Sequence, residues 1–273
     1  MTAITAQELE AQMPDATQLL SDEPEMESSL HYLQLMLLVS CLELAWQDRR
    51  DFFIGANLTI YFSRQQLKNR DFRGPDFFLV KHTERKHRNS WVVWEEDGQY
   101  PDLIIELLSN STVNVDRHLK RKLYAERFHT PEYFYFSPDT LEFAGFRLAL
   151  DQYQPIVAND QGWLWSEVLG LFLGVFNQQL RYFTLAGALL PTPAEALQLE
   201  VEKGLLMVQQ EQLRSQLALE QVEGERQKLQ QQAEQDRLRL EQEAAAERSK
   251  AQEAEAQLRQ LREKLQSLGI TLE

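Results

Sequence analysis

The segment YPDLIIELLSNST, residues 100–112, decides the fold of this chain. Its centre, residues 103–108, is a nearly continuous apolar run of strand length, which is typical of a central strand covered on both faces. Glu106 interrupts the run, and a charge inside a buried strand is costly unless it is paired or bound to a cation. We therefore predict a central strand that carries one functional carboxylate.

The segments on either side of this strand indicate an α/β fold. Apolar residues recur at helical spacing before it and again after it, whereas the remaining apolar runs are short and rich in aromatic and β-branched residues. This predicts a mixed sheet with helices on its faces. The expected helices are 29–47 and 116–128, and the expected strands are 52–54, 58–62, 76–80, 91–94, 103–108, 133–136, 141–150 and 163–168, with a turn at 169–175.

Composition excludes several classes of protein. The 273 residues contain one cysteine, so a disulfide framework and a Cys-based zinc site are excluded. Cys41 lies in an apolar run and is expected to be a core residue. No GxGxxG or Walker motif occurs, which gives nucleotide cofactors no support. The apolar stretch at 33–44 is short and contains Ser40 and Glu43, so we predict no membrane span and a cytoplasmic protein without a signal peptide.

The net charge of −14 argues against a generally basic nucleic-acid coat, but the charge is uneven along the chain. Residues 1–28 contain seven acidic residues and no Lys or Arg, and residues 195–273 contain 16 acidic and 11 basic residues. The region between them is therefore close to neutral. A local basic face that contacts phosphates is possible there, although the charged loop with Lys81, Arg85, Lys86 and Arg88 has a solvated surface as its alternative.

The pattern predicts three regions. Residues 1–27 read as an acidic flexible leader, residues 28–190 as the globular domain, and residues 194–268 as a coiled-coil helix that begins after Pro193. In the C-terminal half of this helix Ala and Leu recur at heptad spacing, whereas the frame is poor around Gly204 and Gly224. We favour self-association into a homo-oligomer over a single solvated helix, because an apolar stripe is better buried.

Three polar residues in the globular domain could form a hydrolytic site. Asp76 opens an apolar strand, Glu106 lies within the central strand, and Lys120 lies on the following helix. Mg²⁺ prefers hard oxygen ligands and keeps several waters, so one or two carboxylates suffice to hold it. The ion would activate water for phosphodiester hydrolysis, and a lysine would stabilise the developing charge. Taken singly, Asp76 could be a strand cap and Lys120 a surface partner of Asp116.

Three motifs resemble one known family. GPDFFLV, YPDLIIELLSNST and DRHLKRKLYAERFHTPEYFYFSPD are similar, in this order, to the Uma-two family of restriction endonucleases in the PD-(D/E)xK nuclease superfamily. The resemblance covers roughly residues 28–190, and the C-terminal LREKLQSLGITLE is similar to the tail of family members. It implies a restriction-endonuclease-like mixed sheet flanked by helices, with Mg²⁺ as cofactor and DNA as substrate.

The resemblance also implies site residues. Asp76 and Glu106 would be the metal ligands and Lys120 the catalytic lysine, with Lys122 as the alternative. The lysine that the superfamily places two residues after the acid is absent here, because Leu108 stands at that position. Secondary candidates are Asp102 as an outer ligand, Asp116 and Tyr124 as residues that orient Lys120, and Glu43 as a further acid.

Two functions follow from the sequence. The first is an Mg²⁺-dependent endonuclease that acts on DNA. The second is a catalytically inactive nuclease-fold protein that binds partners or self-associates through its C-terminal helix. The two differ in one geometric expectation, because only the first requires that Asp76, Glu106 and Lys120 meet in one place.

Overall fold

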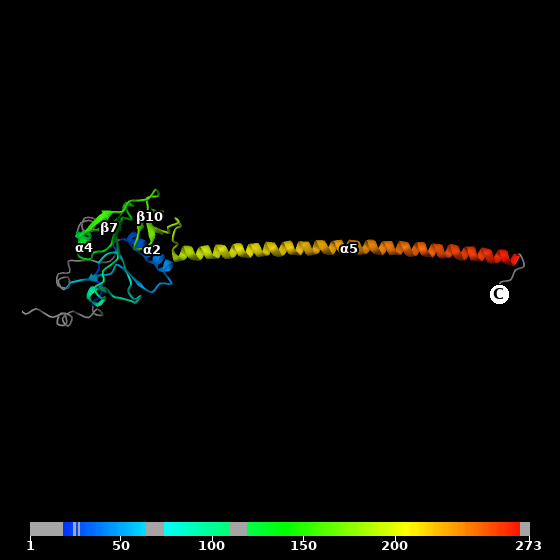
Figure 1. The fold of residues 1–273 in the computed structure, drawn as a ribbon, viewed down its shortest axis with the longest axis horizontal. Helices are drawn as coiled ribbons and strands as arrows, with labels where there is room; N and C mark the ends of the chain where they lie inside the picture. The colour runs from blue at the N-terminus through cyan, green and yellow to red at the C-terminus, as the bar shows by residue number, and fades with distance from the viewer. Residues whose placement is uncertain (1–18, 24–25, 27, 64–73, 110–118, 268–273) are drawn as a thin grey trace, which may run out of the picture. The chain divides into compact units, whose positions relative to one another are not determined.

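The computed structural model describes residues 19–23, 26, 28–63, 74–109 and 119–267. The chain divides into two compact units, Met1–Gln198 and Leu199–Glu273. The first unit is a mixed α/β domain and the second is helical (Figure 1). The predicted fold class, a mixed sheet flanked by helices with a long C-terminal helix, is confirmed.

A six-stranded mixed sheet forms the centre of the first unit, in the order β1-β3-β5-β6-β7-β8. β5 pairs in parallel with β6 and antiparallel with β3. The predicted central strand is thus an interior strand, and each of its five residues is buried. The strands are β1 (Phe52–Ala56), β3 (Phe77–Lys81), β5 (Leu103–Leu107), β6 (Glu132–Phe136), β7 (Phe143–Ala149) and β8 (Gln152–Pro155).

Different elements cover the two faces of this sheet. Helix α2 (Ser29–Ala45) and a three-stranded sheet of β9 (Leu164–Ser166), β10 (Leu171–Phe176) and β11 (Gln179–Phe183) pack on the face that includes Ile105. Helix α4 (Arg121–Glu126) packs on the face that includes Ile104, together with β2 (Ile60–Tyr61), β4 (Trp91–Val92) and the 3-10 helix η2 (Val93–Glu95). Because side chains alternate along a strand, Glu106 lies on the same face as Ile104.

Helix α2 is fixed to the end of β5. The Ser28 hydroxyl caps the helix by accepting the backbone N–H of His31 at 3.3 Å. The buried His31 ring lies 3.2 Å from the carbonyl oxygen of Leu108, directly after β5. Cys41 is buried in the α2 core as expected, and this burial raises the pKa of its thiol to about 11.

Four local features differ from the sequence predictions. The predicted helix 116–128 ends two residues early, because α4 ends at Glu126. It is described from Leu119, with residues 119 and 120 π-helical, and Asp116 lies outside the described residues. Val93 and Trp94 of the predicted strand 91–94 belong to η2. Residues 171–176 form β10 instead of a turn, because they pair with β9 and β11 on either side. Within the predicted leader, Ser21 donates its backbone N–H to Asn89 at 3.1 Å, so residues 19–23 lie against the domain.

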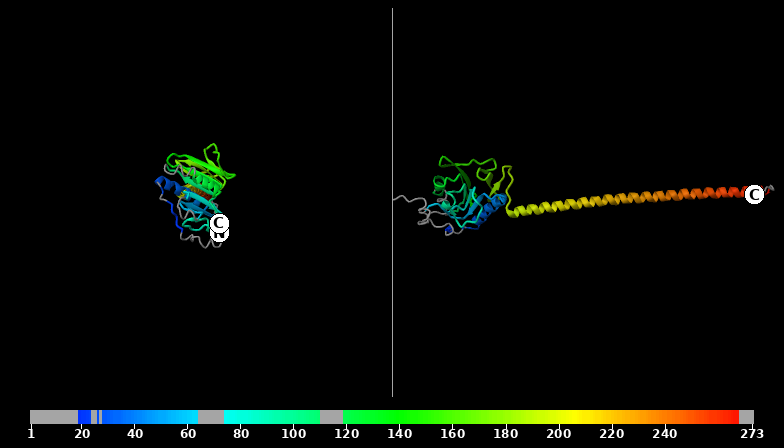
Figure 2. Two further views of the ribbon diagram at one scale, coloured as in Figure 1. Left: turned by 90° about the vertical axis from the view of Figure 1, so that its left-hand side faces the viewer. Right: turned by 60° about the horizontal axis from the view of Figure 1, so that its bottom comes forward.

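Helix α5 (Pro193–Ser267) begins with a capping box at the end of the first unit. The Glu195 backbone N–H donates to the Thr192 hydroxyl at 3.2 Å, and the Thr192 N–H donates to Glu195 Oε2 at 2.8 Å. The buried Arg181 on β11 also binds the Glu195 carboxylate, at 2.6 and 3.1 Å. The right-hand view of Figure 2 shows α5 as one uninterrupted helix. Among the described helices, none combines the length and apolarity needed to cross a bilayer.

Candidate active site

Asp76, which directly precedes β3, lies opposite Glu106 on the neighbouring strand β5. The antiparallel register of β3 and β5 pairs Phe77 with Ile105, so the next opposed pair is Asp76 and Glu106. The Asp76 backbone N–H lies 3.5 Å from Glu106 Oε2, and the Leu107 N–H donates to Asp76 Oδ2 at 2.7 Å. Both carboxylates therefore belong to one cluster, although 30 residues separate them along the chain.

Glu106 is fully buried and is held by two side chains from the helical side of the sheet. Lys120 Nζ lies 3.1 Å from Oε1 and 3.2 Å from Oε2 of Glu106. The Tyr124 hydroxyl donates to Oε1 at 2.7 Å. A carboxylate without solvent contact needs such partners, because desolvation of an isolated charge is far costlier than that of a paired one.

Lys120 and Tyr124 reach Glu106 together because they are four residues apart, one helical turn. The Lys120 side chain is 13% exposed, and its Nζ also donates to the carbonyl oxygen of Gly74 at 3.4 Å. The expectation that Tyr124 orients Lys120 takes a different form in the structure, because the hydrogen bond of Tyr124 goes to Glu106. The three predicted site residues are thus brought together, with Tyr124 as a fourth member of the cluster.

A third carboxylate approaches from a segment that sequence reasoning assigned to the leader. Glu23 Oε1 accepts hydrogen bonds from the Gly74 backbone N–H and from the Thr59 hydroxyl, the latter at 2.8 Å. Gly74 is required at this point, since a Cβ atom there would lie 2.3 Å from the carbonyl oxygen of Leu58. Residues 1–26 show no apolar periodicity, so no sequence signal marked Glu23.

Two secondary candidates, Asp102 and Glu43, and the alternative lysine, Lys122, lie apart from this cluster. The Asp102 carboxylate accepts the Lys81 backbone N–H at 2.7 Å, at the other end of β5 from Glu106. Glu43 pairs with Arg85. The Lys122 side chain is 69% exposed and lies 3.9 Å from Glu126, so it points to solvent and not toward Glu106.

Glu132 is a second buried acid, but its surroundings are structural. It lies at the start of β6 and accepts the Glu167 backbone N–H at 2.9 Å and Arg147 Nη2 at 3.1 Å. It also accepts the Ser166 hydroxyl. These bonds join the six-stranded sheet to β9, so this carboxylate is used as a connector between the two sheets.

The donor set at Asp76 and Glu106 fits a hard cation that retains waters. Two carboxylates side by side are sufficient protein ligands for Mg²⁺, which is bound through one or two carboxylates in many enzymes. Within the described ranges, no group of three or more His, Cys, Asp or Glu residues has the arrangement of a metal site. A cation here would therefore depend on these two acids and on water.

Comparison with known families gives a decisive match. The family model Uma2, described as "Putative restriction endonuclease", matches residues 10–176, more than half of the chain. The chain belongs to the Uma2 family. The resemblance inferred from the three motifs is thereby confirmed. The Uma2 match begins earlier than the predicted domain and includes Glu23 as well as Asp76, Glu106 and Lys120, whereas it ends before α5.

Other comparisons add little to the Uma2 assignment. A solved structure of "a putative nuclease belonging to DUF820" from Anabaena variabilis is 16% identical and covers 54% of this chain and 76% of its own. Its TM-score is 0.39, which is too low to support an argument from structure. A comparison with curated proteins gave no significant match.

Proposed function

We propose that this Uma2 protein is a metal-dependent endonuclease that hydrolyses phosphodiester bonds of DNA. Asp76 and Glu106 would hold the metal, and Lys120 would act on the scissile phosphate. One observation carries the proposal: an acid, a second acid and an amine from three separate segments share one hydrogen-bonded cluster. Membership of a restriction-endonuclease family supports the same chemistry.

Mg²⁺ is the cofactor we propose, because both protein ligands are carboxylates. A bound divalent ion would supply Lewis-acid polarisation of the phosphodiester and a water of lowered pKa. Glu106 has no solvent exposure, so the ion would approach from the side of the partly exposed Asp76. Asp76 and Glu106 would hold the ion, and the Lys120 amine lies within 3.2 Å of both oxygens of Glu106.

The protein's own groups would position the reactants. Tyr124 restrains the Glu106 carboxylate through Oε1, and the Leu107 N–H restrains Asp76 through Oδ2. The Lys120 ammonium lies beside the Glu106 carboxylate, where it would offset the negative charge that develops on the phosphate. Fixed donors and charges of this kind act without reorganisation during the reaction.

Lys120 and Lys122 form a matched pair for the first test. They are two residues apart, but Lys120 contacts Glu106 whereas Lys122 faces solvent. With the full chain, plasmid nicking is measured across a titration of Mg²⁺ and with a chelator. We expect Lys120→Ala to reduce the rate by about 100-fold, as for loss of one charge-stabilising group, and Lys122→Ala to leave it within about 2-fold.

Glu106→Gln gives the second arm of this test, because it keeps the shape of the side chain and removes its charge. We expect no metal-dependent nicking and weaker binding of Mn²⁺, followed by its paramagnetic signal. Circular dichroism verifies that the variant is folded. A folded and fully active Glu106→Gln protein would refute the assignment. Substrates of equal sequence in DNA and RNA decide which of the two nucleic acids is cleaved.

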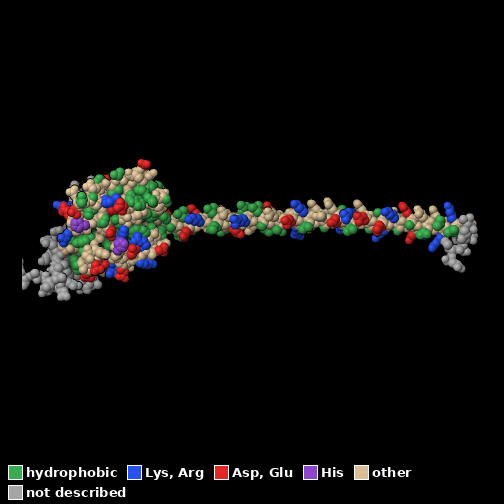
Figure 3. Space-filling model, viewed as in Figure 1, with side chains coloured by type: hydrophobic (Ala, Val, Ile, Leu, Met, Phe, Trp, Pro, Cys, Tyr) green, Lys and Arg blue, Asp and Glu red, His purple; other side chains and the backbone are tan. Residues whose placement is uncertain are grey.

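The exposed face of α5 favours an additional role in self-association, which we propose as a homo-oligomeric coiled coil. Hydrophobic side chains are visible along α5 (Figure 3). Most of the large ones lie between Leu197 and Val222, and Leu199, Leu206 and Leu213 recur at seven-residue spacing with about half of their surface exposed. A helix with such a stripe gains stability when the stripe packs against another helix.

A further inference from the structure

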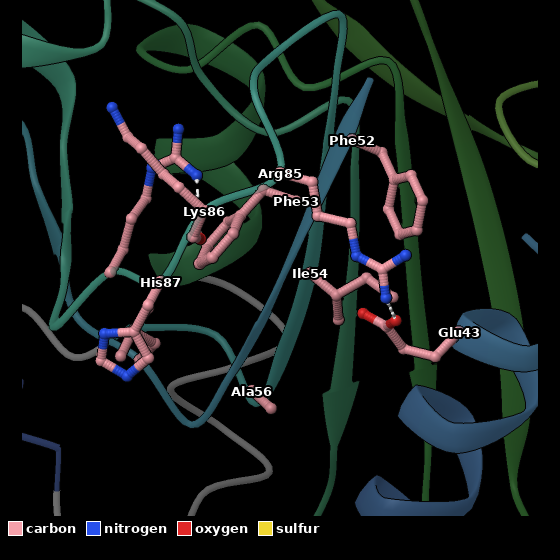
Figure 4. Close-up of a pocket in the computed structure, with 10 residues that line it drawn as sticks. Glu43, Phe52, Phe53, Ile54, Ala56, Arg85, Lys86 and His87 are labelled. Atoms are coloured by element: carbon pink, nitrogen blue, oxygen red, sulfur yellow. Dashed lines mark hydrogen bonds and ion pairs between the residues drawn. The ribbon is translucent and has the colours of Figure 1, made fainter. Parts of the chain in front are cut away.

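A groove of about 480 Å³ lies along β1, the last strand at one edge of the six-stranded sheet. Ile54 and Ala56 of β1 line it, together with Glu43 of α2 and the basic segment 85–88. Arg85 and Glu43 lie on one side of β1, and Lys86 and His87 lie on the other (Figure 4). We call this feature the β1 groove.

The backbone of β1 presents polar groups to this groove. The Asn57 N–H donates to the carbonyl oxygen of Asp76, and the His82 N–H donates to the carbonyl oxygen of Asp51. The backbone N–H and C=O groups of the odd-numbered residues of β1 are therefore directed toward β3. In an antiparallel pair the intervening residues direct their N–H and C=O groups to the opposite side. The N–H groups of Ile54 and Ala56 therefore point toward the β1 groove.

The basic segment is fixed across β1 by two arginines. Arg85 lies over the ring of Phe52, 5.1 Å from its centroid, and pairs with Glu43. Arg88 lies 4.7 Å from the centroid of Phe53, and the Glu96 carboxylate accepts two bonds from it at 2.7 and 2.8 Å. These contacts hold the segment in place. Lys86 is less restrained, since its side chain is 49% exposed and its amine lies 3.8 Å from Glu96.

One end of the β1 groove adjoins the proposed site. Ala56 pairs with Phe77, and the next residue, Asn57, donates to the carbonyl oxygen of Asp76 at 2.7 Å. From Ala56 back to Phe52 the strand extends for about 13 Å, which is the axial length of several nucleotides in a duplex strand. A nucleic-acid strand lying in the groove would therefore end close to the segment that carries Asp76.

We propose that the β1 groove binds the phosphodiester backbone beside the scissile bond, a proposal that rests on the proposed function for the identity of the substrate. Three cationic side chains and His87 line it, and two acids oppose them: Glu43 in the lining, and Glu96, which contacts Arg88 and Lys86. Cations together with outward backbone N–H groups are complementary to phosphate oxygens. An extended peptide could also pair with a strand edge, but it has no need of the cations.

Lys86 is the residue to substitute, because Arg85 and Arg88 also hold the segment in place. Binding of labelled oligonucleotides to the full chain is measured by fluorescence anisotropy in chelator over a series of salt concentrations. The probes are duplex DNA, single-stranded DNA and RNA of one sequence. We expect Lys86→Ala to weaken binding by about 3-fold to 10-fold and to lower the salt slope by about one, the signature of one lost phosphate contact.

Lys228→Ala, an exposed lysine about 50 Å along α5 from Pro193, is the control and should bind as the wild type does. Lys86→Glu should weaken binding more than Lys86→Ala. Unchanged affinity and salt slope in both Lys86 variants, for every probe, would overturn the groove proposal even if the wild type cleaves DNA. If binding depends on Lys86 but no cleavage occurs with any metal, binding of the phosphodiester backbone in the groove stands, whereas the proposed function and its scissile bond fail. The probe with the strongest dependence on Lys86 identifies the substrate.

Discussion

The backbone N–H of Leu107 donates a hydrogen bond of 2.7 Å to Oδ2 of Asp76. The first acid of the proposed site is thus held by the residue that directly follows the second acid. The Asp76 side chain therefore has two separable roles. As a hydrogen-bond acceptor for the Leu107 N–H it needs only an oxygen atom, charged or neutral. As a ligand for a cation it needs its negative charge.

Asp76→Asn and Asp76→Ala test these two roles. We expect Asp76→Asn to keep its free energy of unfolding within about 1 kcal/mol of the wild type, because the amide oxygen can accept from Leu107. The free energy of unfolding of Asp76→Ala should be about 1–3 kcal/mol lower than that of the wild type, because this variant has no acceptor for the Leu107 N–H. Both should lack metal-dependent nicking. Urea denaturation and plasmid nicking are the measurements, and an Asn variant that nicks at the wild-type rate would contradict the assignment.

Tyr124→Phe removes only the hydroxyl that donates to Glu106 Oε1. A hydrogen bond to a buried charge contributes about 2 kcal/mol, so we expect the free energy of unfolding to fall by that amount. We also expect weaker Mn²⁺ binding, because the carboxylate loses one of its restraints. Tyr153→Phe is the matched control, since the buried Tyr153 donates to the carbonyl oxygen of Thr130, a neutral acceptor. Tyr153→Phe should lower the free energy of unfolding by about 1 kcal/mol and leave Mn²⁺ binding unchanged.

The lowered pKa of Glu195 predicts that the stability of the folded chain decreases at acid pH. The hydrogen bond from Arg181 is the main cause that holds the pKa of Glu195 below its usual value of 4.5. A lowered pKa in the folded state means that the carboxylate stabilises the fold above the unfolded pKa and loses this effect as pH falls through the folded one. Thermal unfolding should therefore separate wild type from Glu195→Gln at neutral pH, and the two midpoints should converge below pH 4.5. A constant difference at all pH values would disprove this role.

If α5 forms the proposed coiled coil, the molecular mass of the protein in solution should depend on the presence of α5. In sedimentation equilibrium the full chain should be larger than a monomer, and a chain ending at Gln198, the limit of the first unit, should be monomeric. Replacing Leu199, Leu206 and Leu213 together by Gln in the full chain removes the stripe of leucines at seven-residue spacing. This variant should associate less while α5 stays helical. Equal monomer masses for all three proteins would remove the proposal.

Some of this architecture was predictable because local patterns determine it. The apolar run around Glu106 identified an interior strand, and the spacing of Lys120 and Tyr124 placed them on one helical face. The position of Tyr124 against Glu106 was not predictable, since it depends on how α4 packs on β5. The sequence identifies Glu106 by its place inside an apolar run, whereas Glu132 precedes the predicted strand 133–136 and its burial is seen only in the structure. The partners of the two buried acids differ: Glu106 binds an amine and a phenol, and Glu132 binds a guanidinium, a hydroxyl and backbone N–H groups.

The opposition of Asp76 and Glu106 makes the candidate site depend on the register of β3 and β5. A shift of β3 by one residue would carry Asp76 to the opposite side of the sheet and leave Glu106 facing an apolar neighbour. A chain with this register would lack the proposed site, because the two acids would no longer lie on one side of the sheet.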